Sequence, residues 1–192
     1  MEDYSKYYDL NSYLFNEVSR KYQEQGYIYA FDFFCIIIWK ANRAKTNIFK
    51  KITKIAKSYD LNKICEEITV NLYDIKANEE KLRYLIEHWQ FGIPMASAIL
   101  SVLFPDDFTV YDVRVCQILK KHGNLINKTN IEGIITGYFE YVKDVIDKIP
   151  KKKTLREKDV FLWGESFFLE LTQDIKDGFT RLEKSKLETK KV

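Results

Sequence analysis

Apolar side chains recur every three or four positions along nearly the whole of this 192-residue chain. In the segment 47–60, "NIFKKITKIAKSYD", one stripe carries Ile48, Ile52, Ile55 and Tyr59, and lysines occupy the other faces. No segment shows the strict alternation of apolar and polar residues that is typical of a half-buried strand. Only 7 Gly and 3 Pro interrupt the pattern. The sequence therefore predicts an all-α fold.

The composition supports one folded unit. Hydrophobic residues make up 46% of the chain and aromatic residues 15%, which is enough to bury a substantial core. The chain contains no internal repeat and no long flexible linker. We therefore expect a single helical domain over residues 1–192, with one lobe or two. The tail 180–192 has little to bury, so we expect it to fray.

The cysteines and the apolar runs indicate a cytoplasmic protein without a membrane partner. Cys35, Cys65 and Cys116 lie far apart in apolar surroundings, as buried thiols of a reducing compartment do. The longest apolar run, "FFCIIIW", is too short to span a bilayer. The polar start of the chain, "MEDYSKYYDL", does not have the pattern of a signal peptide.

Capping residues predict where four of the helices begin. Asp32 is a favourable N-cap for a helix through "FFCIIIWKANRAK", although the apolar run also allows a short strand. Asn78 is the expected cap of the helix "EEKLRYLIEHW". Thr129 with Glu132, and Thr154 with Glu157, have the spacing of a capping box, in which a hydroxyl and a carboxylate satisfy free N–H groups reciprocally.

The charges are segregated, although the formal net charge is only +3. No acidic residue lies between Asp32 and Asp60, whereas that stretch carries many basic ones. They are Lys40, Arg43, Lys45, Lys50, Lys51, Lys54 and Lys57. A second basic cluster spans Lys151–Arg156. Such segregation is consistent with a face that contacts phosphates, but on charge alone the solvated face of an amphipathic helix is the preferred interpretation.

The segment 91–115, "FGIPMASAILSVLFPDDFTVYDVRV", predicts two helices that meet at a tight turn near residues 90–94. Gly92 suits the turn, and Pro94 suits the first turn of the second helix, because the N–H that proline lacks would be unpaired there. The helix Met95–Phe104 is apolar and rich in small residues, and Pro105 ends it.

Asp112 is the expected N-cap of the following helix. An aspartate at this position accepts backbone N–H groups and meets the positive end of the helix dipole. A cap is a sufficient explanation for this residue on local grounds. A carboxylate at the start of a helix can also serve in catalysis, and the local pattern leaves both interpretations open.

The same segment resembles the core of the helix-hairpin-helix DNA glycosylase superfamily, the group of endonuclease III, adenine glycosylase and 8-oxoguanine glycosylase. Their hairpin has the form L-P-G-V-G-x-K-T-A, and an apolar helix and a V-D-T-H-V-like stretch follow it. Here "HWQFGIPMA" matches the hairpin and "VYDVRV" the aspartate stretch, within residues 80–122. The resemblance implies a compact helical protein with a helix-hairpin-helix motif, as a divergent member of the group.

The resemblance also implies double-stranded DNA as the partner and gives the site residues. Asp112 would cap its helix and face the target sugar, so it is the candidate catalytic residue. The stretch "IIIWKANRAKTNIFKKI" resembles the segment that faces the DNA, and "DVFLWGESFF" a helix packed behind the site. The candidate DNA-binding residues are Lys40, Asn42, Arg43, Lys45, Gln90, Gly92, Ile93 and Arg114. Trp39, Tyr111 and Trp163 are candidates for the base pocket, and each also suits a core position.

Several positions depart from the family pattern. Gln90 replaces the first hairpin glycine, Arg114 replaces a histidine, and Pro94 stands where bifunctional members carry the lyase lysine. A Schiff base needs an amine, so we expect no lyase activity. No four-cysteine cluster follows, and His88 and His122 lack metal-ligand spacing, so we expect no metal or other cofactor. Relatives can hold a monovalent cation among hairpin carbonyls, which here would be those near Trp89 to Ile93.

The function expected from these features is a monofunctional DNA glycosylase that removes a modified or damaged base. A carboxylate near the sugar stabilises the positive charge that develops as the N-glycosidic bond breaks, and it can orient the attacking water. Two other hypotheses stay open. One is a catalytically silent helix-hairpin-helix module of a repair, defence or restriction system, and the other is a helical protein-interaction domain. The target base depends on the shape of the pocket, which no local pattern encodes.

Overall fold

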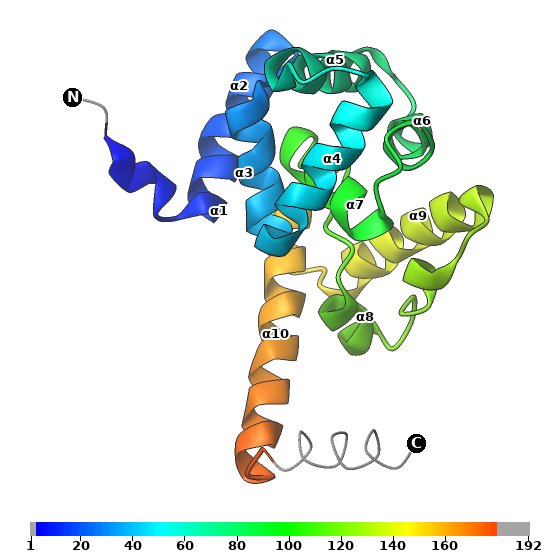
Figure 1. Cartoon of the computed structure of the whole chain (residues 1–192). Coiled ribbons are helices and arrows are strands. Elements are labelled where there is room, and N and C mark those ends of the chain that lie inside the picture. Colours follow the sequence, from blue (N-terminus) through cyan, green and yellow to red (C-terminus); the bar gives the residue numbers. More distant parts are fainter. Residues whose placement is uncertain (1–2, 180–192) are drawn as a thin grey trace, which may run out of the picture.

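The computed structural model describes residues 3–179, and every regular element within that range is helical (Figure 1). The elements are η1 (Tyr4–Tyr7), α1 (Leu10–Ser12), η2 (Tyr13–Val18), α2 (Ser19–Gln25), α3 (Ala30–Ala41), η3 (Asn42–Ala44), α4 (Lys45–Ala56), α5 (Leu61–Asp74), α6 (Asn78–Arg83), η4 (Tyr84–His88), α7 (Ile93–Leu103), α8 (Val113–Leu119), η5 (Leu125–Asn127), α9 (Ile131–Lys148) and α10 (Leu155–Lys176). The all-α prediction is confirmed over this range. The tail predicted to fray, 180–192, lies outside it.

The helices α3 and α7 form the centre of the core. Nearly all of α7 is buried, and its small residues Ala96, Ser97 and Ala98 let neighbouring helices approach closely. Gly92 is the N-cap of α7, and Pro94 lies in its first turn, as predicted. A short turn joins α7 to the end of η4 at His88, so the two helical segments that the sequence predicts on either side of residues 90–94 are both present.

An extended segment, 108–112, leads from α7 to α8, and buried hydroxyl groups hold it in place. The Tyr138 hydroxyl donates to the carbonyl of Thr109 (2.7 Å), and the Tyr141 hydroxyl donates to that of Val110 (2.8 Å). The N–H of Tyr111 donates to the hydroxyl of Ser97 (2.9 Å). Two rings from α9 and one serine from α7 thereby fix the backbone immediately before Asp112.

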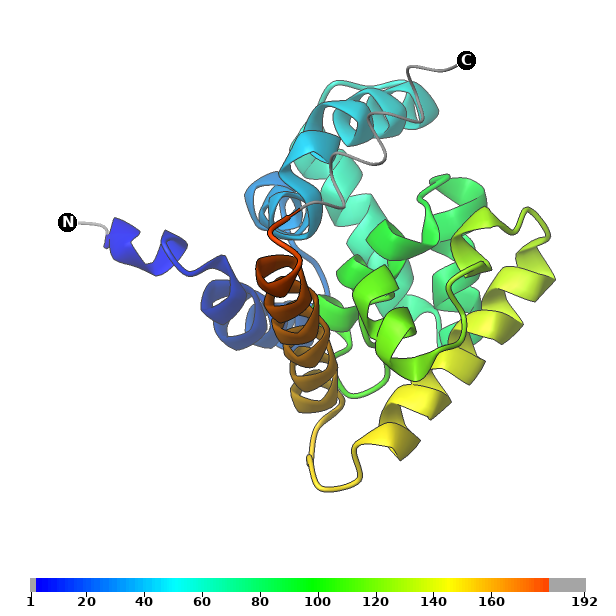
Figure 2. The ribbon, with the colours of Figure 1, turned by 90° about the horizontal axis from the view of Figure 1, so that it is seen from below.

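Helix α10 begins against the body of the protein and then projects away from it (Figures 1 and 2). Its start is the predicted capping box, since Thr154 accepts from the N–H of Glu157 and the Glu157 carboxylate accepts from that of Thr154. Its first turns bury Leu155, Asp159 and Leu162. Beyond them, large apolar side chains are exposed; they include Phe168, Leu169, Leu171 and Ile175.

Three of the predicted helix starts are shifted. Helix α3 begins at Ala30, with Asp32 inside its first turn. The Asp32 carboxylate is buried and is bound by Tyr13 and Lys21 instead of capping the helix. The run "FFCIIIW" lies in this helix, so the short-strand alternative is wrong. The N-cap of α9 is Asn130 and not Thr129, and that of α6 is Ala77 and not Asn78.

All three cysteines are free and buried. Burial raises the pKa of the Cys35 thiol to about 11 and that of Cys65 to about 12, and it also raises the pKa of Cys116. The thiols therefore stay protonated at neutral pH. Among the helices of residues 3–179, none is long and apolar enough to cross a membrane.

Candidate functional site

Asp112 is the N-cap of α8, and its carboxylate has two partners. Oδ1 accepts from the backbone N–H of Arg114 at 3.0 Å, which is the predicted cap. Oδ2 accepts from the Lys40 ammonium at 2.8 Å, and this ammonium also lies 3.4 Å from the carbonyl of Tyr111. The carboxylate is therefore held between the last turn of α3 and the first turn of α8.

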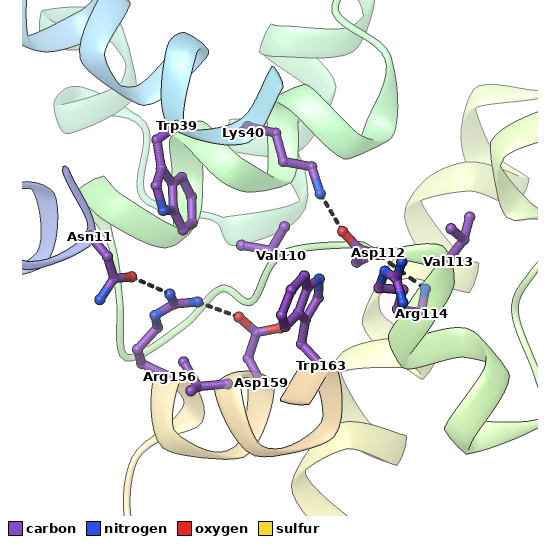
Figure 3. Close-up of a pocket in the computed structure, with 11 residues that line it drawn as sticks. Asn11, Trp39, Lys40, Val110, Asp112, Val113, Arg114, Arg156, Asp159 and Trp163 are labelled. Atoms are coloured by element: carbon purple, nitrogen blue, oxygen red, sulfur yellow. Dashed lines mark hydrogen bonds and ion pairs between the residues drawn. The ribbon is translucent and has the colours of Figure 1, made fainter. Parts of the chain in front are cut away.

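A cavity of about 520 Å³ opens beside this carboxylate (Figure 3). Its walls come from α1, the end of α3, the segment before α8, and the first turns of α10. The lining residues are Asn11, Trp39, Lys40, Val110, Asp112, Val113, Arg114, Arg156, Asp159, Val160 and Trp163. We call it the Asp112 cavity. Its volume is within the usual range for sites that enclose a small molecule.

A second polar group lies on the α10 side of the Asp112 cavity. The Arg156 guanidinium pairs with the Asp159 carboxylate, and its Nη2 donates to the Asn11 side chain at 2.5 Å. The guanidinium stacks over the rings of Phe15 (4.2 Å) and Trp39 (5.2 Å). Its Nε is buried without a hydrogen-bond partner. Four neighbouring side chains therefore position the guanidinium, and its buried Nε–H is left without a partner among the described residues.

Asp159 is the more deeply buried of the two carboxyl groups in the cavity. Its side chain is 6% exposed, whereas that of Asp112 is 21% exposed. Burial raises the pKa of Asp159 to about 6, and the nearby Asp112 also raises it, while Arg156 and Lys40 lower it. A buried carboxyl group with such a pKa exchanges its proton near neutral pH.

The outer rim of the cavity is aromatic. The rings of Trp163 and Phe167 are parallel to within 6°, with centroids 5.7 Å apart. The Arg114 guanidinium lies over both rings, at 5.6 and 5.8 Å, and pairs with Glu170. Both rings are more than two fifths exposed. Such a surface offers a π face to a planar group that enters the cavity.

The structure brings together five of the residues predicted from sequence: Trp39, Lys40, Asp112, Arg114 and Trp163 all line the Asp112 cavity. It places Tyr111 elsewhere. The Tyr111 ring is fully buried against Tyr141, and its hydroxyl donates to the carbonyl of His122. Tyr111 is therefore a core residue that supports the segment before Asp112, not a wall of the cavity.

The predicted DNA-binding residues lie in two other places. Asn42, Arg43 and Lys45 are exposed in η3 and at the start of α4, immediately after Lys40. Gln90 and Gly92 are exposed in the turn before α7, and Ile93 is buried. Lysine and arginine side chains near a cavity mouth suit contact with phosphates.

The turn before α7 already has a cationic partner from the protein. Gln90 adopts a left-handed conformation with φ of 55°, and its carbonyl accepts a hydrogen bond from the Lys51 ammonium at 2.5 Å.

Within residues 3–179, no group of three or more His, Cys, Asp or Glu side chains is arranged to hold a metal ion.

Asn11, Arg156 and Asp159 were not predicted as site residues. In the sequence, Arg156 is the end of a basic cluster, and Asp159 is one residue of a predicted helix. The i,i+3 spacing of Arg156 and Asp159 was the available signal, because it places a guanidinium and a carboxylate on one helix face. Asn11 gave no signal, since it lies 145 residues from Arg156.

Comparison of the chain with protein families, with curated protein sequences and with solved structures gives no significant match.

Proposed function

We propose that the protein is a monofunctional DNA glycosylase, which removes a modified or damaged base by attack of water at the N-glycosidic bond. The observation that carries the proposal is the position of Asp112. Its carboxylate caps a helix, is fixed by Lys40, and forms part of the wall of a 520 Å³ cavity. The resemblance of "VYDVRV" and "HWQFGIPMA" to the glycosylase motifs, including the helix-hairpin-helix, points to the same residue.

The chemistry assigns separate tasks to the carboxylate and to the cavity. Departure of the base leaves positive charge on C1′ and O4′ of the deoxyribose, and a fixed carboxylate stabilises that charge without having to reorganise. The base must first leave the helical stack and enter a pocket. The indoles of Trp39 and Trp163 are the planar walls available for it in the Asp112 cavity. Lys40 keeps the carboxylate oriented while this occurs.

The surface beside the cavity supports double-stranded DNA as the partner. The basic residues Arg43 and Lys45 follow directly after the cavity residues Trp39 and Lys40 in the chain. Helix α4 continues the basic stretch with exposed Lys50 and further lysines. Phosphate contacts made there would place a duplex over the cavity mouth.

The decisive test is Asp112→Asn. Asparagine caps a helix nearly as well as aspartate, so the fold and the duplex affinity should survive. Loss of the charge should lower the rate of base release by about 10²–10³-fold, as removal of a transition-state electrostatic group does. Duplexes with a panel of modified bases, treated with alkali after incubation, give the rate. Melting temperature and duplex affinity are measured on the same samples.

Asp60→Asn is the matched control. Asp60 is also an N-cap, since its side chain accepts from the N–H of Lys63 at 3.2 Å, and it lies on α5, outside the Asp112 cavity. This variant should release bases at the wild-type rate. Base release by Asp112→Asn at the wild-type rate would refute the catalytic role of the carboxylate.

The proposed enzyme acts without lyase chemistry. Pro94 occupies the position of the lyase lysine, and the Lys40 ammonium is bound by Asp112 and the Tyr111 carbonyl, so it is not a free nucleophile. Borohydride should therefore trap no covalent adduct with DNA that contains an abasic site. A trapped adduct that disappears in Lys40→Gln would make Lys40 a nucleophile and the enzyme bifunctional.

A protein-interaction domain is the second candidate, and one observation favours it. The projecting part of α10 exposes Phe168, Leu169, Leu171 and Ile175, and exposed apolar patches mark sites of association. This alternative predicts neither salt-dependent duplex binding nor base release. A catalytically silent DNA-binding module predicts duplex binding without base release from any member of the panel.

A further inference from the structure

The two carboxyl groups of the Asp112 cavity occupy different environments. Asp112 is bound by the Lys40 ammonium and by a backbone N–H, and its side chain is 21% exposed. Asp159 lies on α10, beside the indole of Trp163, and is almost completely buried. Such a separation of environments assigns an ionised role to one carboxyl group and a proton-donating role to the other.

The geometry makes the Asp159 proton available to a bound group. Oδ2 of Asp159 pairs with Arg156, which orients the carboxyl group, and the side chain points from α10 into the cavity (Figure 3). Asp112 lies on the facing wall, in the segment before α8. A group that enters the cavity therefore meets a carboxyl group on each of two walls.

We propose that Asp159 is the general acid of the glycosylase reaction, which donates its proton to a ring nitrogen of the departing base while Asp112 faces the sugar. This inference rests on the proposed function and adds a substrate class to it. The substrates are neutral bases, because a neutral purine or pyrimidine is a poor leaving group until it is protonated. Bases that carry a fixed positive charge after alkylation leave without this help.

The Asp159 O–H bond breaks, and the proton forms an N–H bond with the base. The C1′–N bond breaks, and its electron pair stays on the base. Water adds to C1′, and its proton passes by way of Asp112 to solvent. Asp159 then regains a proton from solvent, so no oxidant, reductant or cofactor is consumed.

The charged and titratable groups that face Asp159 come from four elements. Arg156 lies on its own helix, Lys40 on α3, and Asp112 before α8, while Tyr138 and Tyr141 of α9 are close enough for Asp159 to raise their pKa. Burial and Asp112 raise the pKa of Asp159 to about 6, and the two cations lower it. At neutral pH, a minor fraction of the enzyme therefore carries the proton, and this fraction falls as the pH rises.

The test compares two leaving groups in single turnover, with the released base quantified by chromatography. One set of duplexes contains neutral bases that keep a basic ring nitrogen, such as hypoxanthine or 8-oxoguanine. The other contains 7-methylguanine, which is cationic in the nucleotide. Asp159→Asn should slow release of the neutral base by about 10²–10⁴-fold, the usual contribution of a general acid, and leave release of 7-methylguanine within about twofold. Asp32→Asn, at another buried and paired aspartate outside the cavity, is the control for loss of a buried charge.

The pH profile of the wild-type enzyme is an independent readout that needs no variant. Release of a neutral base should fall about tenfold per pH unit above pH 6, whereas release of 7-methylguanine should not. The assignment would be overturned if Asp159→Asn lost activity equally on both substrates, or lost none on either. It would also be overturned if the wild type released only cationic bases, or if its release of a neutral base did not depend on pH. Absence of base release from every duplex by the wild type would instead refute the proposed function, and the role of Asp159 with it.

Discussion

The ammonium of Lys40 lies 2.8 Å from Oδ2 of Asp112, and the two side chains are 14% and 21% exposed. This ion pair joins the end of α3 to the start of α8 across 72 residues of sequence. Removal of Lys40 leaves a carboxylate that is mostly buried and has lost its cation. The pair thus contributes both to the fold and to the orientation of the candidate catalytic group.

A double-mutant cycle measures this coupling. In the free energy of unfolding, Lys40→Met and Asp112→Asn should couple by about 1–2 kcal/mol, because each change leaves the other partner without its ion pair. Urea titrations of the wild type, both single variants and the double variant provide the four values. The pair Arg20–Glu24 is the control, because its side chains are 66% and 60% exposed and its coupling should be a few tenths of a kcal/mol. Purely additive effects at Lys40 and Asp112 would mean that the pair adds nothing to stability.

Salt dependence tests the predicted DNA-binding segment. If Arg43 and Lys45 contact phosphates, the variant in which both are alanine should bind a duplex more weakly. Its plot of log affinity against log salt should be shallower by about 0.9 for each lost contact. Fluorescence anisotropy at four or five salt concentrations gives the slope. The control is Lys63→Ala with Lys76→Ala, exposed lysines on and after α5. An identical slope for the two double variants would exclude a specific role for the segment after α3.

Titration of Asp159 should lower the free energy of unfolding as the pH rises from about 4 to about 6. Its pKa is raised by burial to about 6 in the folded state and is about 3.9 in an unfolded chain. The folded protein therefore binds more protons in this window, and stability is lost as the pH rises through it. The unfolding free energy of the wild type, measured relative to that of Asp159→Asn, should fall by about 2 kcal/mol from pH 4 to pH 7. Carboxylates with lowered pKa, such as Glu157 and Asp144, give the opposite slope, but they are common to both proteins and cancel in the difference.

Replacement of Gln90 by glycine should increase the stability of the folded protein. Its φ of 55° is left-handed, which costs a residue with a Cβ roughly 1–2 kcal/mol, and glycine avoids this cost. The greater freedom of glycine in the unfolded chain offsets about 0.4–1 kcal/mol of the gain. We expect Gln90→Gly to raise the melting temperature and Gln90→Val to lower it. Gln25→Gly, in the last turn of α2, should lower it.

The features predicted correctly are those that neighbouring residues determine. The Thr154–Glu157 box and the Asp112 cap depend on residues within one turn, and both are present. Asp32 satisfies the same local rule for an N-cap. It does not act as one because Tyr13 and Lys21, from another helix, bind its carboxylate inside the protein. Tertiary contacts can therefore override a local rule whenever the polar group is buried.

The candidate site could be predicted from sequence only in part. Trp39, Lys40, Asp112, Arg114 and Trp163 followed from the resemblance, whereas the polar group of the opposite wall comes from segments far apart in the chain. Asn11 and Arg156 meet only because α1 and α10 pack on one side of the body. Nothing in the spacing of either segment encodes that contact. The polarity of Asp159 was visible in the sequence, but its burial was not.

The reactivity of the three buried thiols reports how often the helices around them open locally. Cys35 lies in α3, Cys65 in α5 and Cys116 in α8, so alkylation of each thiol requires a different helix to open. Mass spectrometry after timed exposure to iodoacetamide would resolve the three rates in one experiment. Cys116 is three residues beyond the first residue of α8, the helix that Asp112 caps. Its labelling rate would therefore follow how often the aspartate end of the cavity loosens, and would show whether a bound duplex slows that motion.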